Sequence, residues 1–102
     1  MEELIQQYAN HLRNERNVSP HTLRNYLSDL RQFRQFLEQR DLTAEADRQI
    51  DVRRLDVHVV RAYLASLTRD RKKSSMGRKL AALKGFFRYL LANHKVDKNP
   101  LL

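Results

Sequence analysis

The sequence predicts an all-α fold, a compact bundle of four or five helices, and three observations support this. Apolar residues recur at helical spacing in four separate stretches. Only two glycines and two prolines occur in 102 residues, so few positions interrupt regular structure. The valine-rich segment at residues 57–60 shows neither the alternation nor the turn residues of a β-hairpin. A chain of this length can bury roughly two-thirds of its unfolded surface, enough for one domain with one core.

The first helix is predicted to run from about Glu2 to Arg16. After it, Asn17 can take the left-handed backbone conformation that closes a helix, and Val18 can pack back as a hydrophobic staple. The buried face of this helix is marked by apolar residues at i, i+3/i+4 spacing: Leu4, Ile5, Tyr8 and Leu12.

The second helix is predicted from Pro20 to about Gln39. Ser19 is a suitable N-cap, and Pro20 suits the first helical position because its missing N–H costs nothing there. An apolar stripe at helical period follows, formed by Leu23, Tyr26, Leu27, Leu30, Phe33 and Leu37. The other face of the first turns is polar and basic, with no acid before Asp29; it carries His21, Thr22, Arg24, Asn25 and Ser28.

Residues 41–55 are mixed in character, and we predict a loop that can include one helical turn around Thr43 to Asp47. Asp56 is the expected cap of a third helix, because apolar residues follow it at helical spacing: Val57, Val60, Leu64 and Leu67.

A fourth helix is predicted from a cap at Ser74 or Ser75 to about Asn93. Asn99-Pro100 then ends regular structure, because the residue before a proline resists the helical region. The exposed face is expected to start with Ser75, Arg78, Lys79 and Ala82. The apolar positions are Met76, Leu80, Leu83, Phe86, Phe87, Leu90 and Leu91.

The net charge of +8 is unevenly distributed. Residues 1–68 are neutral overall, and the whole excess lies in residues 69–102. A one-sided positive field favours a polyanion such as nucleic acid, although a solubilising surface is the alternative reading of charge alone.

Several classes of function find no support in the sequence. The chain has no cysteine, which excludes disulfides and thiolate metal sites and fits a reducing compartment such as the cytoplasm. The four histidines are scattered and lack metal-ligand spacing, and there is no glycine-rich phosphate loop. No apolar run approaches the roughly 20 residues of a membrane helix. We therefore expect no catalytic constellation, metal or cofactor.

The starts of the second and fourth helices resemble each other. Both combine hydroxyl groups with cationic or amide side chains and lack acids, so they can hold a phosphate at backbone N–H groups and direct side chains toward base edges. The alternative is two ordinary capped helices with solvated surfaces. We predict binding to double-stranded DNA at both starts through His21, Thr22, Arg24, Asn25, Ser28, Lys72, Lys73, Ser74, Ser75, Arg78 and Lys79.

Residues 12–26, which include Ser19-Pro20-His21-Thr22, resemble the opening of Xer-type tyrosine recombinases and phage integrases. The shared pattern is a helix ending in an acidic-basic pair, then Ser-x-x-Thr, then a helix with an aromatic residue four positions on. The segment at residues 78–90, with its Ala-Leu-x-x-Phe-Phe motif, and Asn99-Pro100 resemble the end of the same domain. The resemblance covers essentially the whole chain.

This resemblance implies the N-terminal core-binding domain, a SAM-like bundle, at residues 1–98, with residues 99–102 beginning a linker. In the family, this domain and a catalytic domain form a C-shaped clamp around the recombination site, and both helix starts face the DNA. The family's catalytic Arg, Lys, His and Tyr lie in the second domain, so no catalytic residue is carried over. We expect a monomer without enzymatic activity of its own, which would join other recombinase protomers only in a full-length protein.

Two other functions remain open from the residues alone. One is a stand-alone DNA-binding accessory protein, and the other is a helical protein-interaction module whose basic face meets an acidic partner. For DNA binding, we expect Arg24, Asn25, Arg78 and Lys79 to lie on one side of the folded domain, because they fall away from the apolar stripes or at their margins.

Overall fold

The computed structural model describes residues 1–40, 50–68 and 73–101, with the backbone alone for 73–75. Within these residues the chain forms four α-helices and no strand, so the all-α prediction is confirmed. The helices are α1 (Glu2–Asn14), α2 (Pro20–Glu38), α3 (Val57–Leu67) and α4 (Lys73–Ala92), and a 3-10 turn (Val52–Arg54) precedes α3. The predicted turn around Thr43 to Asp47 lies outside the described residues.

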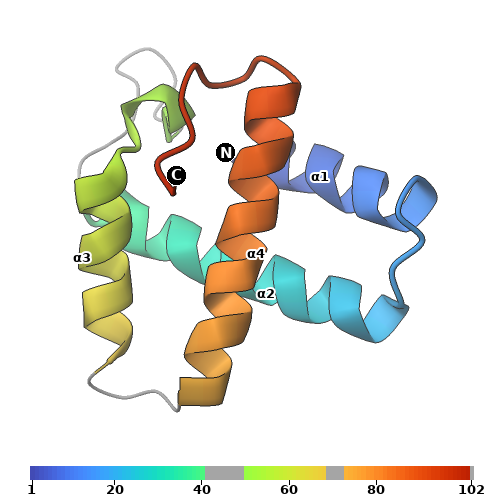
Figure 1. Cartoon of the computed structure of the whole chain (residues 1–102), viewed down its shortest axis with the longest axis horizontal. Coiled ribbons are helices and arrows are strands. Elements are labelled where there is room, and N and C mark those ends of the chain that lie inside the picture. The colour runs from blue at the N-terminus through green and yellow to red at the C-terminus, as the bar shows by residue number, and fades with distance from the viewer. Residues whose placement is uncertain (41–49, 69–72, 102) are drawn as a thin grey trace.

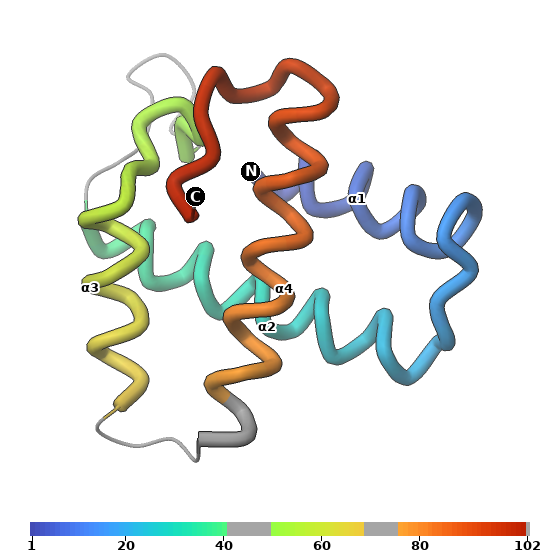
Figure 2. The backbone as a smooth tube through the Cα atoms, viewed as in Figure 1, coloured from blue at the N-terminus to red at the C-terminus, as the bar shows by residue number. Residues whose placement is uncertain are grey.

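Helix α4 is the centre of the arrangement. It crosses in front of α2 at a steep angle, with α3 alongside it on one flank and α1 beyond it on the other (Figures 1 and 2). Contacts between elements agree with this view, since α4 packs against α1, α2 and α3, and α1 also packs against α2. A helix surrounded in this way must bury a wide arc of its surface.

The core lies where α4 crosses α2. Leu30, Phe33, Phe86 and Phe87 have no exposed surface. The rings of Phe33 and Phe87 meet edge to face at 6.2 Å between centroids, and Phe33 makes a similar contact with Tyr63 of α3 at 5.0 Å. The apolar stripes predicted for α1 and α2 therefore face inward, and aromatic packing joins α2, α3 and α4.

Helix ends follow local sequence signals. The Ser19 hydroxyl accepts a hydrogen bond from the Thr22 N–H at 3.1 Å, and the Asp56 carboxylate accepts one from the Val59 N–H at 3.0 Å. Asn17 has a φ of 52°, so the predicted left-handed closure of α1 is confirmed. None of the helices in the described residues has the length and apolarity needed to cross a membrane.

Two predictions about α4 are wrong. The helix begins at Lys73, so Ser74 and Ser75 have helical backbone and neither is the N-cap, which requires a non-helical conformation. Its exposed face also differs, because Lys79 is 2% exposed and Ala82 is fully buried. The exposed positions of its described part are Gly77, Arg78, Ala81, Lys84, Arg88 and Ala92. The charge of Lys79 suggested a surface position, but contacts on three sides of α4 turn that arc inward.

Candidate nucleic-acid interface

A buried carboxylate joins α2 to α4 at their crossing. Asp29 of α2 is 2% exposed and accepts two hydrogen bonds from Arg78, one from Nε and one from Nη2, each 3.0 Å long. It also accepts a 2.8 Å hydrogen bond from the Lys79 ammonium, which donates a further one to the Gln32 side-chain oxygen at 2.7 Å. One buried anion therefore meets two cations from the other helix.

Lys79 requires a correction as a site residue. Its ammonium group lies in the protein interior and is engaged by Asp29 and Gln32, so it cannot reach a phosphate on the surface. A buried ammonium needs such partners because desolvation penalises an unpaired charge heavily. The predicted DNA-binding side shared by Arg24, Asn25, Arg78 and Lys79 is wrong for Lys79 and stays a prediction for the other three.

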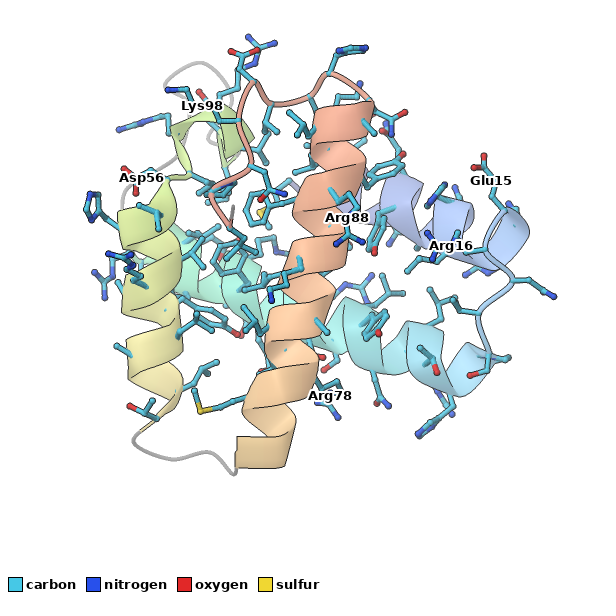
Figure 3. The ribbon with its side chains drawn as sticks, in the orientation of Figure 1. Glu15, Arg16, Asp56, Arg78, Arg88 and Lys98 are labelled. Carbon is cyan, nitrogen blue, oxygen red and sulfur yellow. The ribbon has the colours of Figure 1, made fainter. Side chains whose placement is uncertain are left out.

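Arg78 lies at the outer edge of this cluster. Its side chain is 41% exposed and projects from the lower half of α4 (Figure 3). The hydrogen bonds to Asp29 raise the pKa of Arg78, so the guanidinium stays charged. Beside it, the exposed residues Gly77 and Ala81 carry little or no side chain, and a Cβ built on Gly77 would meet nothing within 4 Å. The surface around Arg78 is therefore open to close approach.

The start of α2 offers a second group of polar side chains. His21, Arg24 and Ser28 are exposed, while Thr22 and Asn25 are half-buried. The Asn25 amide nitrogen lies 3.3 Å from the His21 Nε2, and the Ser19 hydroxyl donates to the Thr22 hydroxyl at 2.9 Å. These local contacts order the first turns of α2.

For the site residues predicted at the start of α4, the structure describes the side chains of Arg78 and Lys79 but not those of the others. Lys72 lies outside the described residues, and for Lys73, Ser74 and Ser75 only the backbone is described. The start of α2 and the start of α4 lie at different edges of the molecule because the two helices cross (Figure 1).

A groove of about 550 Å³ between α1, α2 and α4 contains cations that the sequence analysis missed. Arg16, Lys84 and Arg88 line it together with Tyr8 and Tyr26, and no acidic residue is among its described lining residues. Arg16 and Arg88 come from opposite walls (Figure 3). Burial raises the pKa of Tyr8 and the nearby Tyr26 adds to the shift, whereas the charges of Arg16 and Arg88 oppose it. In the sequence, the i, i+4 spacing of Lys84 and Arg88, which places both on one face of the helix, was the signal that could have indicated this basic groove.

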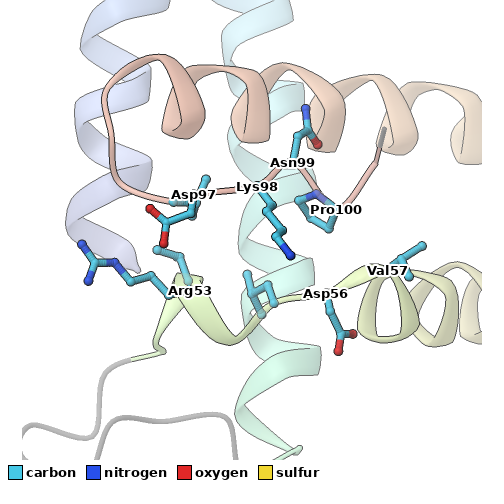
Figure 4. Close-up of a pocket in the computed structure, with 10 residues that line it drawn as sticks. Arg53, Asp56, Val57, Asp97, Lys98, Asn99 and Pro100 are labelled. Carbon is cyan, nitrogen blue, oxygen red and sulfur yellow. The ribbon is translucent and has the colours of Figure 1, made fainter.

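A second hollow, of about 470 Å³, lies between the 3-10 turn, the start of α3 and the segment after α4 (Figure 4). Its charged lining residues have both signs, Arg53 and Lys98 against Asp56 and Asp97. Mixed charge does not favour a polyanion, so this hollow is the weaker candidate. Within the described ranges, no group of three or more His, Cys, Asp or Glu residues could hold a metal ion.

Comparison with known proteins agrees with this helical, basic architecture. Residues 5–94 match the phage integrase N-terminal SAM-like domain. The chain belongs to this family. No solved structure is significantly similar to the chain.

Relatives of this family member include bacterial tyrosine recombinases. The chain is 42% identical over 102 residues to tyrosine recombinase XerC of Syntrophus aciditrophicus, covering 99% of the chain and 33% of that protein. It is 44% identical over 98 residues to XerC of Pelobacter propionicus, covering 96% of the chain and 31% of that protein. The chain thus spans about a third of the length of these relatives.

Proposed function

We propose that this chain is the DNA-binding module of a site-specific tyrosine recombinase, and that it performs no strand chemistry by itself. The strand-cutting residues would then lie in parts of the parent protein that match the remaining two-thirds of the relatives. The substrate is double-stranded DNA carrying a recombination core site, and no cofactor is needed for binding.

The observation that carries this proposal is the groove whose described lining holds three cations and no acid. Arg16, Lys84 and Arg88 line this hollow together with the polar aromatic side chains of Tyr8 and Tyr26. Cations from α4 and from the connector after α1 that share a concave surface suit a phosphate backbone, because DNA binding gains affinity by releasing counterions. Family membership supports DNA as the polyanion.

In this proposal, the duplex spans the first turns of α2 and α4, which lie at different edges of the molecule. The groove connects the two, since Thr22 of α2 and Ala81 of α4 both line it. At the α2 start, His21, Thr22, Arg24, Asn25 and Ser28 contact DNA. Asn25 is the candidate for base readout there, because an amide can pair bidentately with adenine. At the α4 start, Arg78 contacts DNA together with Lys72, Lys73, Ser74 and Ser75, whereas buried Lys79 is not included.

The test is a titration of fluorescent duplex DNA at several salt concentrations. We expect weak binding whose logarithmic affinity falls linearly with the logarithm of salt between about 50 and 200 mM. Arg88→Ala should weaken binding to most sequences and flatten the salt slope by up to about one unit. Lys98→Ala is the matched control, because it removes an equal exposed charge from the mixed hollow.

Three outcomes would contradict the proposal. An affinity that is indifferent to salt would exclude a phosphate-driven interface and leave a protein-interaction module as the better reading. Equal effects of Arg88→Ala and Lys98→Ala would show that net charge alone attracts DNA. Backbone amide shifts on titration should cluster at residues 19–28 and 72–88, and shifts confined to residues 41–55 would contradict the proposed surface.

We also propose that the chain is monomeric and meets other recombinase protomers only within a longer protein. An interface in the standard size range buries about 1,200–2,000 Å². The resemblance to tyrosine recombinases implies that protomers are joined largely by catalytic-domain contacts, so this helical bundle alone is not expected to supply an interface of that size. Sedimentation velocity at micromolar concentration should give a single species of monomer mass, and a tight dimer would contradict this proposal.

A further inference from the structure

Among the described residues, the guanidinium of Arg78 is hydrogen-bonded along one of its edges. Asp29 accepts from Nε and from Nη2, which occupies the side of the group facing α2. An arginine has five N–H donors in a rigid planar fork, so the edge formed by Nη1 and the second N–H of Nη2 stays available. No described residue accepts a hydrogen bond from that edge, and the side chain is 41% exposed.

The carboxylate that holds Arg78 is itself immobilised. The Asp29 side chain is 1% exposed and lies in the middle of α2, so it has little freedom to change its position. Arginine normally loses much rotamer freedom when it binds a ligand. In this structure part of that loss has already occurred before any ligand arrives, because two hydrogen bonds fix the orientation of the guanidinium plane.

The same carboxylate makes Arg78 a weaker general attractor of phosphate than an unpaired cation. Asp29 lies 3.0 Å from the guanidinium and offsets part of its charge, because the Lys79 ammonium shares the same carboxylate, whereas Lys84 and Arg88 have no ion-pair partner among the described residues. The surroundings favour a close contact instead, since Gly77 and Ala81 leave the helix surface bare beside Arg78. A guanidinium with a fixed orientation and a partly offset charge, beside residues with little side chain, is better suited to hydrogen bonding with the edge of a base than to general attraction of phosphates.

We propose that Asp29 is a positioning residue that aims the free edge of Arg78 at a guanine in the major groove, making Arg78 a determinant of sequence specificity. Guanine presents O6 and N7 as two adjacent acceptors, which match the Nη1/Nη2 edge bidentately. This inference rests on the proposed DNA-binding function and adds a division of labour. Arg16, Lys84 and Arg88 attract the backbone, and Arg78 reads sequence.

The experiment selects bound duplexes from a pool with randomised positions and counts the bases recovered. For the wild-type chain, we expect one position at which guanine is preferred by about 5- to 100-fold. Arg78→Lys should abolish that preference, because an ammonium keeps the charge but lacks the fork. The salt slope on duplex of arbitrary sequence should change little, which separates base reading from charge.

A matched pair of variants tests Asp29. Lys79→Met removes the buried ammonium but keeps the Asp29–Arg78 pair, and Asp29→Asn/Lys79→Met additionally removes the carboxylate charge without leaving a lone buried cation. If Asp29 positions Arg78, the guanine preference should persist in Lys79→Met and fall several-fold in the double variant, although Arg78 is present in both. Circular dichroism establishes that both variants are helical before binding is compared.

The possible outcomes separate this inference from the proposed function. Binding without any guanine preference, or a preference that survives Arg78→Lys, overturns the inference while DNA binding stands. Equal loss in Lys79→Met and the double variant overturns the positioning role of Asp29, because it shows a merely structural effect. A wild-type chain that binds no duplex overturns both proposals.

Discussion

Asp29, Gln32, Arg78 and Lys79 form the hydrogen-bonded cluster that joins α2 to α4. Removing the charge of Asp29 should destabilise the protein more than any other single change in this cluster. In Asp29→Asn the shape of the side chain is retained, but the Lys79 ammonium, 2% exposed, loses the one anionic partner that it has among the described residues and keeps Gln32 as an acceptor. Removing one member of a buried ion pair costs about 3–5 kcal/mol. That is a large fraction of the roughly 5–15 kcal/mol that stabilises a domain.

Lys79→Met gives the comparison that tests this reasoning. It leaves Asp29 paired with Arg78 through two hydrogen bonds, so no buried charge is unpaired, and methionine fills much of the space of the lysine stem. Removing one member of a buried ion pair is costly when it leaves an unpaired charge, and Lys79→Met avoids this because Arg78 still pairs with Asp29. We expect Asp29→Asn to cost several times more than Lys79→Met, and the double variant to cost less than the sum of the two.

The assay is urea unfolding followed by far-ultraviolet circular dichroism, since the chain has no tryptophan. With a urea dependence of about 1–3 kcal/mol per molar, the midpoint of Asp29→Asn should fall by about 2 M. Equal midpoints for Asp29→Asn and Lys79→Met would refute the asymmetry. A strictly additive double variant would show that Asp29 and Lys79 do not interact in solution.

Three further changes probe the helices. Gly85→Ala should lower the free energy of unfolding by about 1–3 kcal/mol, because the new Cβ would overlap the Tyr8 hydroxyl. In a Tyr8→Phe background that hydroxyl is absent, so the helix propensity of alanine should instead raise the free energy of unfolding by up to about 1 kcal/mol. Stabilisation in both backgrounds, measured by urea unfolding, would contradict the overlap. Leu30→Ala should cost about 2–5 kcal/mol, because Leu30 is fully buried, and an unchanged melting temperature would contradict that placement. Ser19→Ala should cost about 1 kcal/mol through loss of the cap, whereas Ser19→Asp, measured alongside it, should keep most of the stability.

Local signals in the sequence predict most of the secondary structure. Ser19, Asp56 and Asn17 act within a few residues of themselves, so their capping and closing roles follow from residue type and position. The inward stripes of α1 and α2 were predictable because each of these helices has one dominant apolar face. The DNA-binding hypothesis likewise came from charge distribution and from a resemblance that the family match confirms.

The sequence by itself therefore determined the helical class, the helix ends that depend on neighbouring residues, and the family. Only the tertiary structure decided which charges are exposed. Lys79 is buried because Asp29, 50 residues earlier, meets it where α4 crosses α2, and no local pattern reports a partner at that separation. Arg16 and Arg88 share a groove for the same reason, because packing of α1 against α4 brings the connector after α1 close to α4. Helical periodicity gives the direction of a side chain relative to its own helix, whereas exposure depends on what the rest of the chain places against it.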